Sequence, residues 1–120
     1  MNGDIAMTEE SVIDGVNLRF YTHTRIKHNG MLLSEWLLEQ AWKHKLGGGS
    51  VFRAIAGFGK HGVLHEEAFF DLADDLPIKV EFVLRESEAD ALLQIVRDAG
   101  IELVYVRMPA RIGVLKKSGK

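Results

Sequence analysis

The stretch DLPIKVEFVLRESEADALLQIVRDAGIELVYV, residues 75–106, contains a strand pattern, a helix pattern and a second strand pattern in direct succession. Pro77 introduces a segment in which apolar and polar side chains alternate, and this predicts a half-buried strand. Apolar residues then recur at helical spacing. Ser87 is expected to cap this helix with Asp90 at its third position, and Gly100 fits the position just past its end. Alternation returns over 101–106 and predicts another strand.

The N-terminal half repeats this order. Residues 16–21 alternate and predict the first strand, and residues 50–58 predict the second. Between them lies an apolar stripe typical of a helix over 31–46, with Asn29 as its expected N-cap and Gly47 just past its end. The resulting order βαββαβ is the ferredoxin-like arrangement, an α+β sandwich with an antiparallel sheet.

The bulk composition fits one compact domain. The chain has 120 residues and is 47% hydrophobic, enough to bury a core. We expect a flexible N-terminal arm over 1–14, the ferredoxin-like domain over 15–114 and a basic C-terminal tail over 115–120. The formal net charge of −2 argues against a nucleic-acid partner. Neither a signal peptide nor a membrane-spanning segment is expected, and this favours a cytoplasmic protein without membrane insertion.

The sheet face that the helices leave open carries an unusual mixture of residues. Opposite charges stand beside bulky apolar groups, whereas a solvated face would be more uniformly polar. Such a mixture suits contact with another subunit, and three sheets around an axis would close the assembly. We therefore expect a homotrimer. The residues on this face are Arg19, Tyr21, Lys79, Glu81, Glu102, Val104 and Val106.

Residues 47–65, GGGSVFRAIAGFGKHGVLH, are rich in glycine and admit several interpretations. A Walker A loop is excluded, because Ala54 replaces its first glycine and His61 replaces its hydroxyl residue. Residues 57–62 match the dinucleotide-binding spacing G-x-G-x-x-G, but the following segment makes a poor crossover helix. His61 and His65 would share one face of a helix and are a candidate metal site.

The same glycines also suit a site for an anion. Gly57 and Gly59 permit close backbone approach, and Lys60 follows them directly. Glycine amides together with arginine side chains make a credible phosphate pocket, and a purely structural role for the glycines is equally consistent with the pattern. The arginines expected near this bend are Arg53, Arg107 and Arg111.

Several of these motifs resemble a known family. The segments LRFY, GGGSVFRAIAGFG and DLPIKVEFV, with the helix that follows, are similar to the PII-like proteins of domain-of-unknown-function family one hundred and ninety. The resemblance spans about residues 17–107. This chain departs from the family pattern at Ala54, where glycine is usual, and at Thr22-His23-Thr24, where glycine-glutamate is usual.

The resemblance implies a trimeric signalling or sensor protein and not an enzyme. In PII relatives an adenine nucleotide or a cyclic dinucleotide lies in the cleft between subunits. The long connection after the second strand reports its presence to a partner, often a membrane transporter. By analogy, Gly57, Gly59 and Lys60 lie at the base of that connection, here 58–76. Arg107 and Arg111 fall on the C-terminal segment that helps to hold phosphates. The alternative is a metal-binding trimer resembling the CutA proteins, using His61 and His65.

Overall fold

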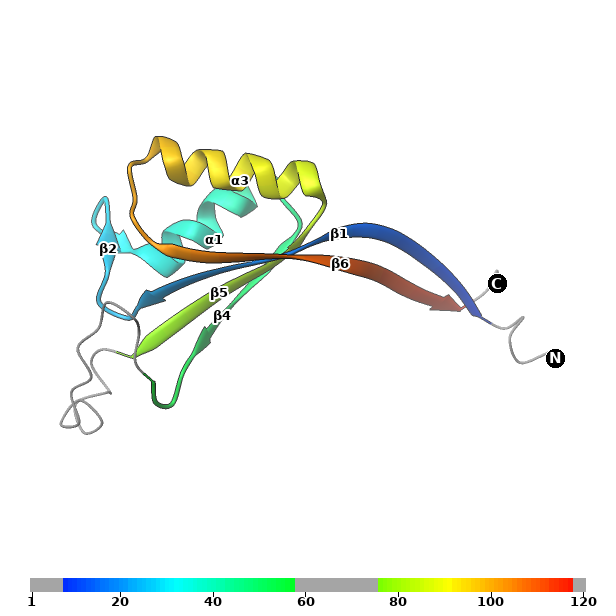
Figure 1. Ribbon diagram of the computed structural model, residues 1–120, viewed down its shortest axis with the longest axis horizontal. Helices are drawn as coiled ribbons and strands as arrows, with labels where there is room; N and C mark the ends of the chain where they lie inside the picture. Colours follow the sequence, from blue (N-terminus) through cyan, green and yellow to red (C-terminus); the bar gives the residue numbers. More distant parts are fainter. Residues whose placement is uncertain (1–7, 58–75, 118–120) are drawn as a thin grey trace.

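The computed structural model describes residues 8–57 and 76–117. Two helices cover one face of a four-stranded antiparallel sheet, in the strand order β4-β5-β1-β6, and a small β2-β3 hairpin lies beside them (Figure 1). The βαββαβ order and the α+β class predicted from sequence are confirmed. The elements are β1 (Thr8–His23), β2 (Lys27–His28), β3 (Met31–Leu32), α1 (Leu33–Lys43), β4 (Gly48–Arg53), β5 (Pro77–Leu84), α3 (Glu86–Asp98) and β6 (Val104–Lys117).

The core lies between the sheet and the helices. Alternate residues of β5, and of β1 from Val16 to Thr22, point toward the helices and are almost fully buried, as the period-two pattern requires. The rings of Phe20 and Phe82 pack edge to face with centroids 6.1 Å apart. Leu37 of α1 and Leu92 of α3 are fully buried against this layer. The sheet therefore has one covered face and one open face.

The start of each helix differs from the sequence prediction. In α3 the N-cap is Arg85, whose backbone N–H donates to Glu88 Oε1 at 2.7 Å, so the helix begins before Ser87 and the predicted Ser87–Asp90 cap is wrong. In α1 the N-cap is Leu32. Asn29 and Gly30 instead have φ angles of 53° and 82° and form the turn between β2 and β3, where two positive φ angles suit a tight hairpin.

The helix ends and the strand bounds show further differences. Gly100 follows α3 with a φ of 71°, as predicted. Helix α1 ends at Lys43, before the expected end at 46, and β4 spans Gly48–Arg53 in place of the predicted 50–58. The last strand, expected over 101–106, begins at Val104 and continues to Lys117.

The ends of the domain differ most from expectation. Residues 8–14, expected in a flexible arm, belong to β1 and pair in register with residues 111–117 of β6. Pairing with β5 ends at Val16, so beyond that point β1 and β6 form a two-stranded ribbon. We call residues 8–15 with 110–117 the β1–β6 arm. Figure 1 shows it extending past α3 and curving toward the side opposite the helices.

Candidate functional site

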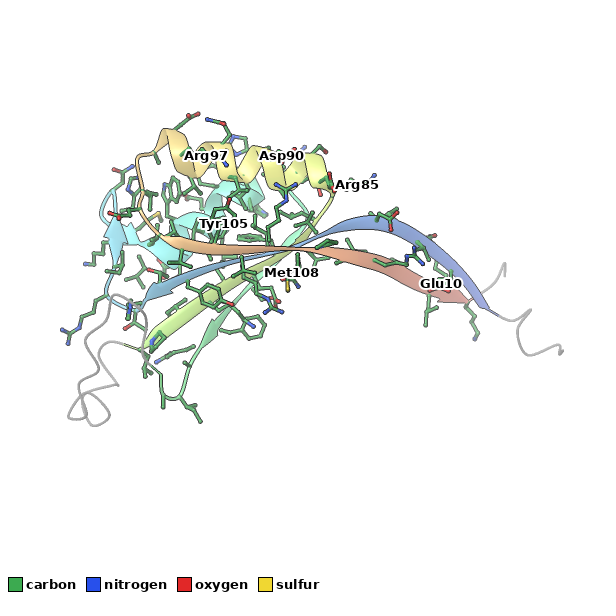
Figure 2. The ribbon with its side chains drawn as sticks, viewed as in Figure 1. Glu10, Arg85, Asp90, Arg97, Tyr105 and Met108 are labelled. Atoms are coloured by element: carbon green, nitrogen blue, oxygen red, sulfur yellow. The ribbon has the colours of Figure 1, made fainter. Side chains whose placement is uncertain are left out.

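The open face of the sheet carries a mixed set of side chains, as the alternation predicted. The strand register places Arg19 beside Glu81 on one side and Val106 on the other. Figure 2 shows Met108 on the side of β6 away from the helices, in keeping with its pairing to Asn17. Glu102 precedes β6 and is not part of the sheet. The strand residues of this face are Asn17, Arg19, Tyr21, Ser50, Phe52, Lys79, Glu81, Val83, Val104, Val106 and Met108.

Glu81 is the centre of a polar network on this face. Its Oε2 accepts hydrogen bonds from Asn17 Nδ2 and Arg19 Nε, each at 3.0 Å. Lys79 Nζ lies 3.9 Å from its Oε1 and 4.6 Å from the centroid of the Phe52 ring. The Asn17 hydrogen bond, with the nearby charge of Lys79 and the contact to Arg19, lowers the pKa of the Glu81 carboxyl. Two cations, Arg19 and Lys79, therefore share the single carboxylate of Glu81, and the network as a whole remains positively charged.

The basic residues predicted to bind phosphate lie at opposite edges of the sheet. Arg53 ends the edge strand β4, whereas Arg107 and Arg111 belong to the other edge strand, β6. Arg53 lies in the row of Thr22 and Arg111 in the row of Asp14. These rows are separated by about 26 Å along β1, at roughly 3.3 Å per residue. A single chain does not bring the three arginines together.

Each β6 arginine faces a carboxylate of its own chain. Arg107 Nη1 lies 2.8 Å from Asp90 Oδ1 of α3, and Arg111 Nε lies 3.6 Å from Asp14 Oδ1. The Arg111 side chain is 76% exposed, so that pair is open to solvent. Exposed pairs of this kind contribute little to stability.

Other predicted site residues lie outside the described part of the chain. Gly59, Lys60, His61 and His65 are among them, as is most of the 58–76 connection. Gly57 is described, and it follows β4 on the approach to that connection. Within residues 8–57 and 76–117 no group of three or more metal-ligating side chains is found. In the same ranges no helix has the length and apolar character needed to span a bilayer.

A hollow of about 570 Å³ opens between α1 and β4. Leu38 and Trp42 of α1 form one wall, and residues 47–49 form the floor. The Trp42 side chain is exposed, with 81% of its surface accessible. None of the predicted phosphate-binding residues that the structure describes lines this hollow.

Comparison with known families identifies the chain. The profile of DUF190, a family described as "Uncharacterized ACR", matches residues 15–111. The chain belongs to the DUF190 family. It is also 35% identical over 77 residues to a UPF0166 protein of Aquifex aeolicus (strain VF5), an alignment covering 64% of this chain and 73% of that relative. The family resemblance expected from sequence is confirmed.

Solved structures confirm the PII-like fold of this DUF190 member. A protein from Thermus thermophilus, described as a "putative PII-like signaling protein", aligns over 86% of this chain and 91% of its own, with a TM-score of 0.54 and 15% identity. CPII from Thiomonas intermedia K12, a nitrogen regulatory PII-like protein bound to ADP, AMP and bicarbonate, aligns over 87% of this chain and 98% of its own. Its TM-score is 0.56 and its identity 13%.

Two features of this DUF190 member were missed in the sequence. Asn17 was not singled out, although its period-two position places it on the same face as Arg19 and beside Glu81. The second feature is the outer part of the β1–β6 arm. The family match begins at Gly15 and ends at Arg111, so most of the arm lies beyond it.

Proposed function

We propose that this chain is a PII-like regulatory protein that forms a homotrimer and binds a phosphorylated small molecule between subunits. The main support for this proposal is that the predicted basic residues lie at opposite edges of one sheet. Arg53 on β4 and Arg107 with Arg111 on β6 meet only if the β4 edge of one copy approaches the β6 edge of the next. In a cyclic assembly each interface repeats this arrangement, and each forms one site.

The open face supports self-association. Val104 and Val106 are exposed there, at 51% and 37%, on the same face as the Arg19–Glu81–Lys79 network. Burying the two valines in a subunit contact removes apolar surface from water. The face therefore suits contact with further copies of itself.

The ligand class follows from the donors. Arginine side chains bind phosphate oxygens with two parallel N–H bonds, and glycine amides allow close approach of the backbone. Gly57, Gly59 and Lys60 would supply the second set of donors at the base of the 58–76 connection. CPII is bound to ADP and AMP, and an adenine nucleotide is accordingly the first ligand to test.

The proposed output is regulation of a partner protein rather than catalysis. A nucleotide in the cleft would change the order of the 58–76 connection and so expose or hide a contact surface. A membrane transporter is the first class of partner to test, by analogy with the PII relatives. We place the protein in the cytoplasm, where both nucleotide and partner surface are accessible.

Native mass spectrometry with a panel of adenine nucleotides tests this proposal, because it reports subunit number and bound ligand together. The wild-type chain is expected to appear as a trimer carrying nucleotide. Ligand at a hundred times Kd stabilises the folded state by about 2.7 kcal/mol and so raises the melting temperature. The Arg111→Ala variant should remain a trimer but lose this nucleotide-dependent rise. Arg97→Ala, on the exposed side of α3, is the matched control. A strictly monomeric chain at micromolar concentration would overturn the proposal.

A further inference from the structure

The hollow between α1 and β4 lies apart from the residues of the proposed nucleotide cleft. Its floor is formed by residues 47–49, whereas Arg53 ends β4, about 13 Å from Gly49 at roughly 3.3 Å per residue. Arg107 and Arg111 belong to β6, at the other edge of the sheet. With a volume of about 570 Å³, the hollow is in the size range of small-molecule sites. It is therefore a second place on this chain where a ligand fits.

The glycines at the start of β4 keep the base of the hollow open and apolar. A Cβ atom on Gly49 would lie 2.5 Å from Cε1 of Phe82 and 3.1 Å from Cδ2 of Leu38. Because glycine has no such atom, the Phe82 ring and the Leu38 side chain both line the hollow. An apolar group of a ligand can therefore pack there against carbon atoms.

One face of α1 forms the outer wall of the hollow. Four of its residues are spaced three or four positions apart, so they lie along one side of the helix. They are Glu35, Leu38, Glu39 and Trp42, and all of them line the hollow. The Trp42 side chain is exposed to solvent at this wall. The wall therefore presents a large aromatic ring together with two carboxylates one helical turn apart.

The charges on this wall favour a positively charged ligand. Lys43 Nζ lies 3.9 Å from Glu39 Oε1, but both side chains are exposed to solvent, and such pairs are weak. Among residues 8–57 and 76–117 no ion pair to Glu35 is found. Like charges one turn apart on a helix repel each other. A cation beside Glu35 and Glu39 relieves this repulsion, whereas an anion increases it.

We infer that the hollow between α1 and β4 binds a small organic cation, in which an ammonium group is carried on an apolar body. The body packs against Leu38 and Phe82 at the glycine floor. The ammonium group faces the Trp42 ring and the Glu35 carboxylate, and tryptophan attracts cations more strongly than the other aromatic side chains. The inference goes beyond the proposed function and does not depend on it, because it concerns a different site and a ligand of opposite charge.

Tryptamine, tryptophol and indole-3-acetate test the inference, since they carry an ammonium, a hydroxyl and a carboxylate on the same indole body. The chain has two tryptophans, so isotopically labelled protein gives two indole N–H signals in an NMR correlation spectrum. The Trp42 signal should shift to saturation with tryptamine. The signal of Trp36, whose ring packs against His28, is the internal reference.

Tryptamine should bind about two- to fivefold more tightly than tryptophol, which is the range for a cation over an exposed aromatic ring. Indole-3-acetate should bind most weakly. Added salt should weaken the binding of tryptamine and leave that of tryptophol unchanged. Equal affinities for tryptamine and tryptophol, or a Trp42 signal that does not saturate, would overturn the inference.

Two glutamate substitutions separate the charge from the shape of the site. Glu35→Gln removes one charge from the wall, and Glu102→Gln makes the same change at an exposed position before β6, at the other edge of the sheet. Glu35→Gln should weaken tryptamine binding about two- to fivefold and leave tryptophol binding unchanged. Glu102→Gln should bind both as the wild type does. If the two variants bind tryptamine equally well, the charge preference is overturned.

The outcomes also distinguish this site from the nucleotide cleft. The nucleotide-dependent rise in melting temperature should be the same for Glu35→Gln as for the wild type. A chain that binds tryptamine at Trp42 and binds no nucleotide keeps the cation site and removes the proposed function. A nucleotide-binding chain whose Trp42 signal does not respond to tryptamine removes the cation site alone.

Discussion

Arg107 of β6 donates a hydrogen bond from Nη1 to Asp90 Oδ1 of α3 at 2.8 Å, so an edge strand is tied to the helix that covers it. The Asp90 side chain is 67% exposed and that of Arg107 30% exposed, which makes this a surface ion pair. Within the proposed site the same guanidinium has a second role, because it is also a donor for phosphate. The carboxylate and the ligand then compete for one group.

Replacing Asp90 separates these roles. Asp90→Ala should lower the free energy of unfolding by no more than about 1 kcal/mol, since exposed pairs contribute little. It should also strengthen nucleotide binding, because the Arg107 guanidinium is released from its intramolecular acceptor. Urea denaturation measures the first effect and titration calorimetry the second. Weaker nucleotide binding by the Asp90→Ala variant would exclude Arg107 from the site.

Mixed trimers test whether each site uses two chains. Arg53→Ala and Arg111→Ala are each expected to abolish nucleotide binding in homotrimers. When the two variants are unfolded together and refolded in equal amounts, about a quarter of the interfaces should regain an intact Arg53 edge facing an intact Arg111 edge. Calorimetric stoichiometry measures that fraction. A mixture in which no binding returns would show that the two arginines do not act together across a subunit interface.

The Glu81 network predicts a pH dependence of stability. The folded state holds the pKa of this carboxyl below its ordinary value of 4.5, so near that pH the unfolded chain binds more protons. Stability contributed by Glu81 is therefore fully present above pH 4.5 and is lost as pH falls through the lowered folded pKa. Denaturant unfolding between about pH 7 and about pH 3 should show a smaller loss for Glu81→Gln than for the wild type. If both proteins lose the same free energy of unfolding over this pH range, the pKa of Glu81 is not lowered in the folded state.

Adjacent glycines in β4 offer a matched test of packing. A Cβ atom on Gly49 would lie 2.5 Å from Cε1 of Phe82, whereas one on Gly48 meets nothing within 4 Å. Gly49→Ala should destabilise the protein by about 1–3 kcal/mol, since the core ring must move. Gly48→Ala should be neutral or stabilising by up to about 1 kcal/mol. Thermal unfolding of the two variants side by side measures the difference, and equal melting temperatures would contradict the contact.

The parts of the fold that the sequence predicts well are those specified by local periodicity. Strand β5 and helix α3 are examples, because alternation over Pro77–Leu84 and helical spacing up to Gly100 leave few alternatives. The outer part of β1 is different. Residues 8–14 have no clear pattern of their own and become a strand only through pairing with 111–117, a partner about a hundred residues away in sequence.

In the candidate site, too, features that depend on local periodicity are predictable, and features that depend on contacts between distant segments are not. The positions of Arg19 and Glu81 are predictable, because the alternation of side chains along β1 and β5 places both residues on the open face of the sheet. The attachment of Arg107 to Asp90 is not, because it depends on where α3 crosses above β6. Asn29 illustrates competition between local signals. It suits a helix cap, but the glycine that follows makes it a better hairpin turn, and the turn is what forms.

The last described pair of the arm is Thr8 with Lys117, so the first and last strands of the domain end side by side. A short designed linker could join them covalently, and the chain could then be opened at the exposed Asn29–Gly30 turn. Such a circular permutant would keep every strand neighbour of the sheet while moving the termini to the opposite end of β1. Fusion partners or fluorescent labels could then be attached without crowding the tip of the ribbon.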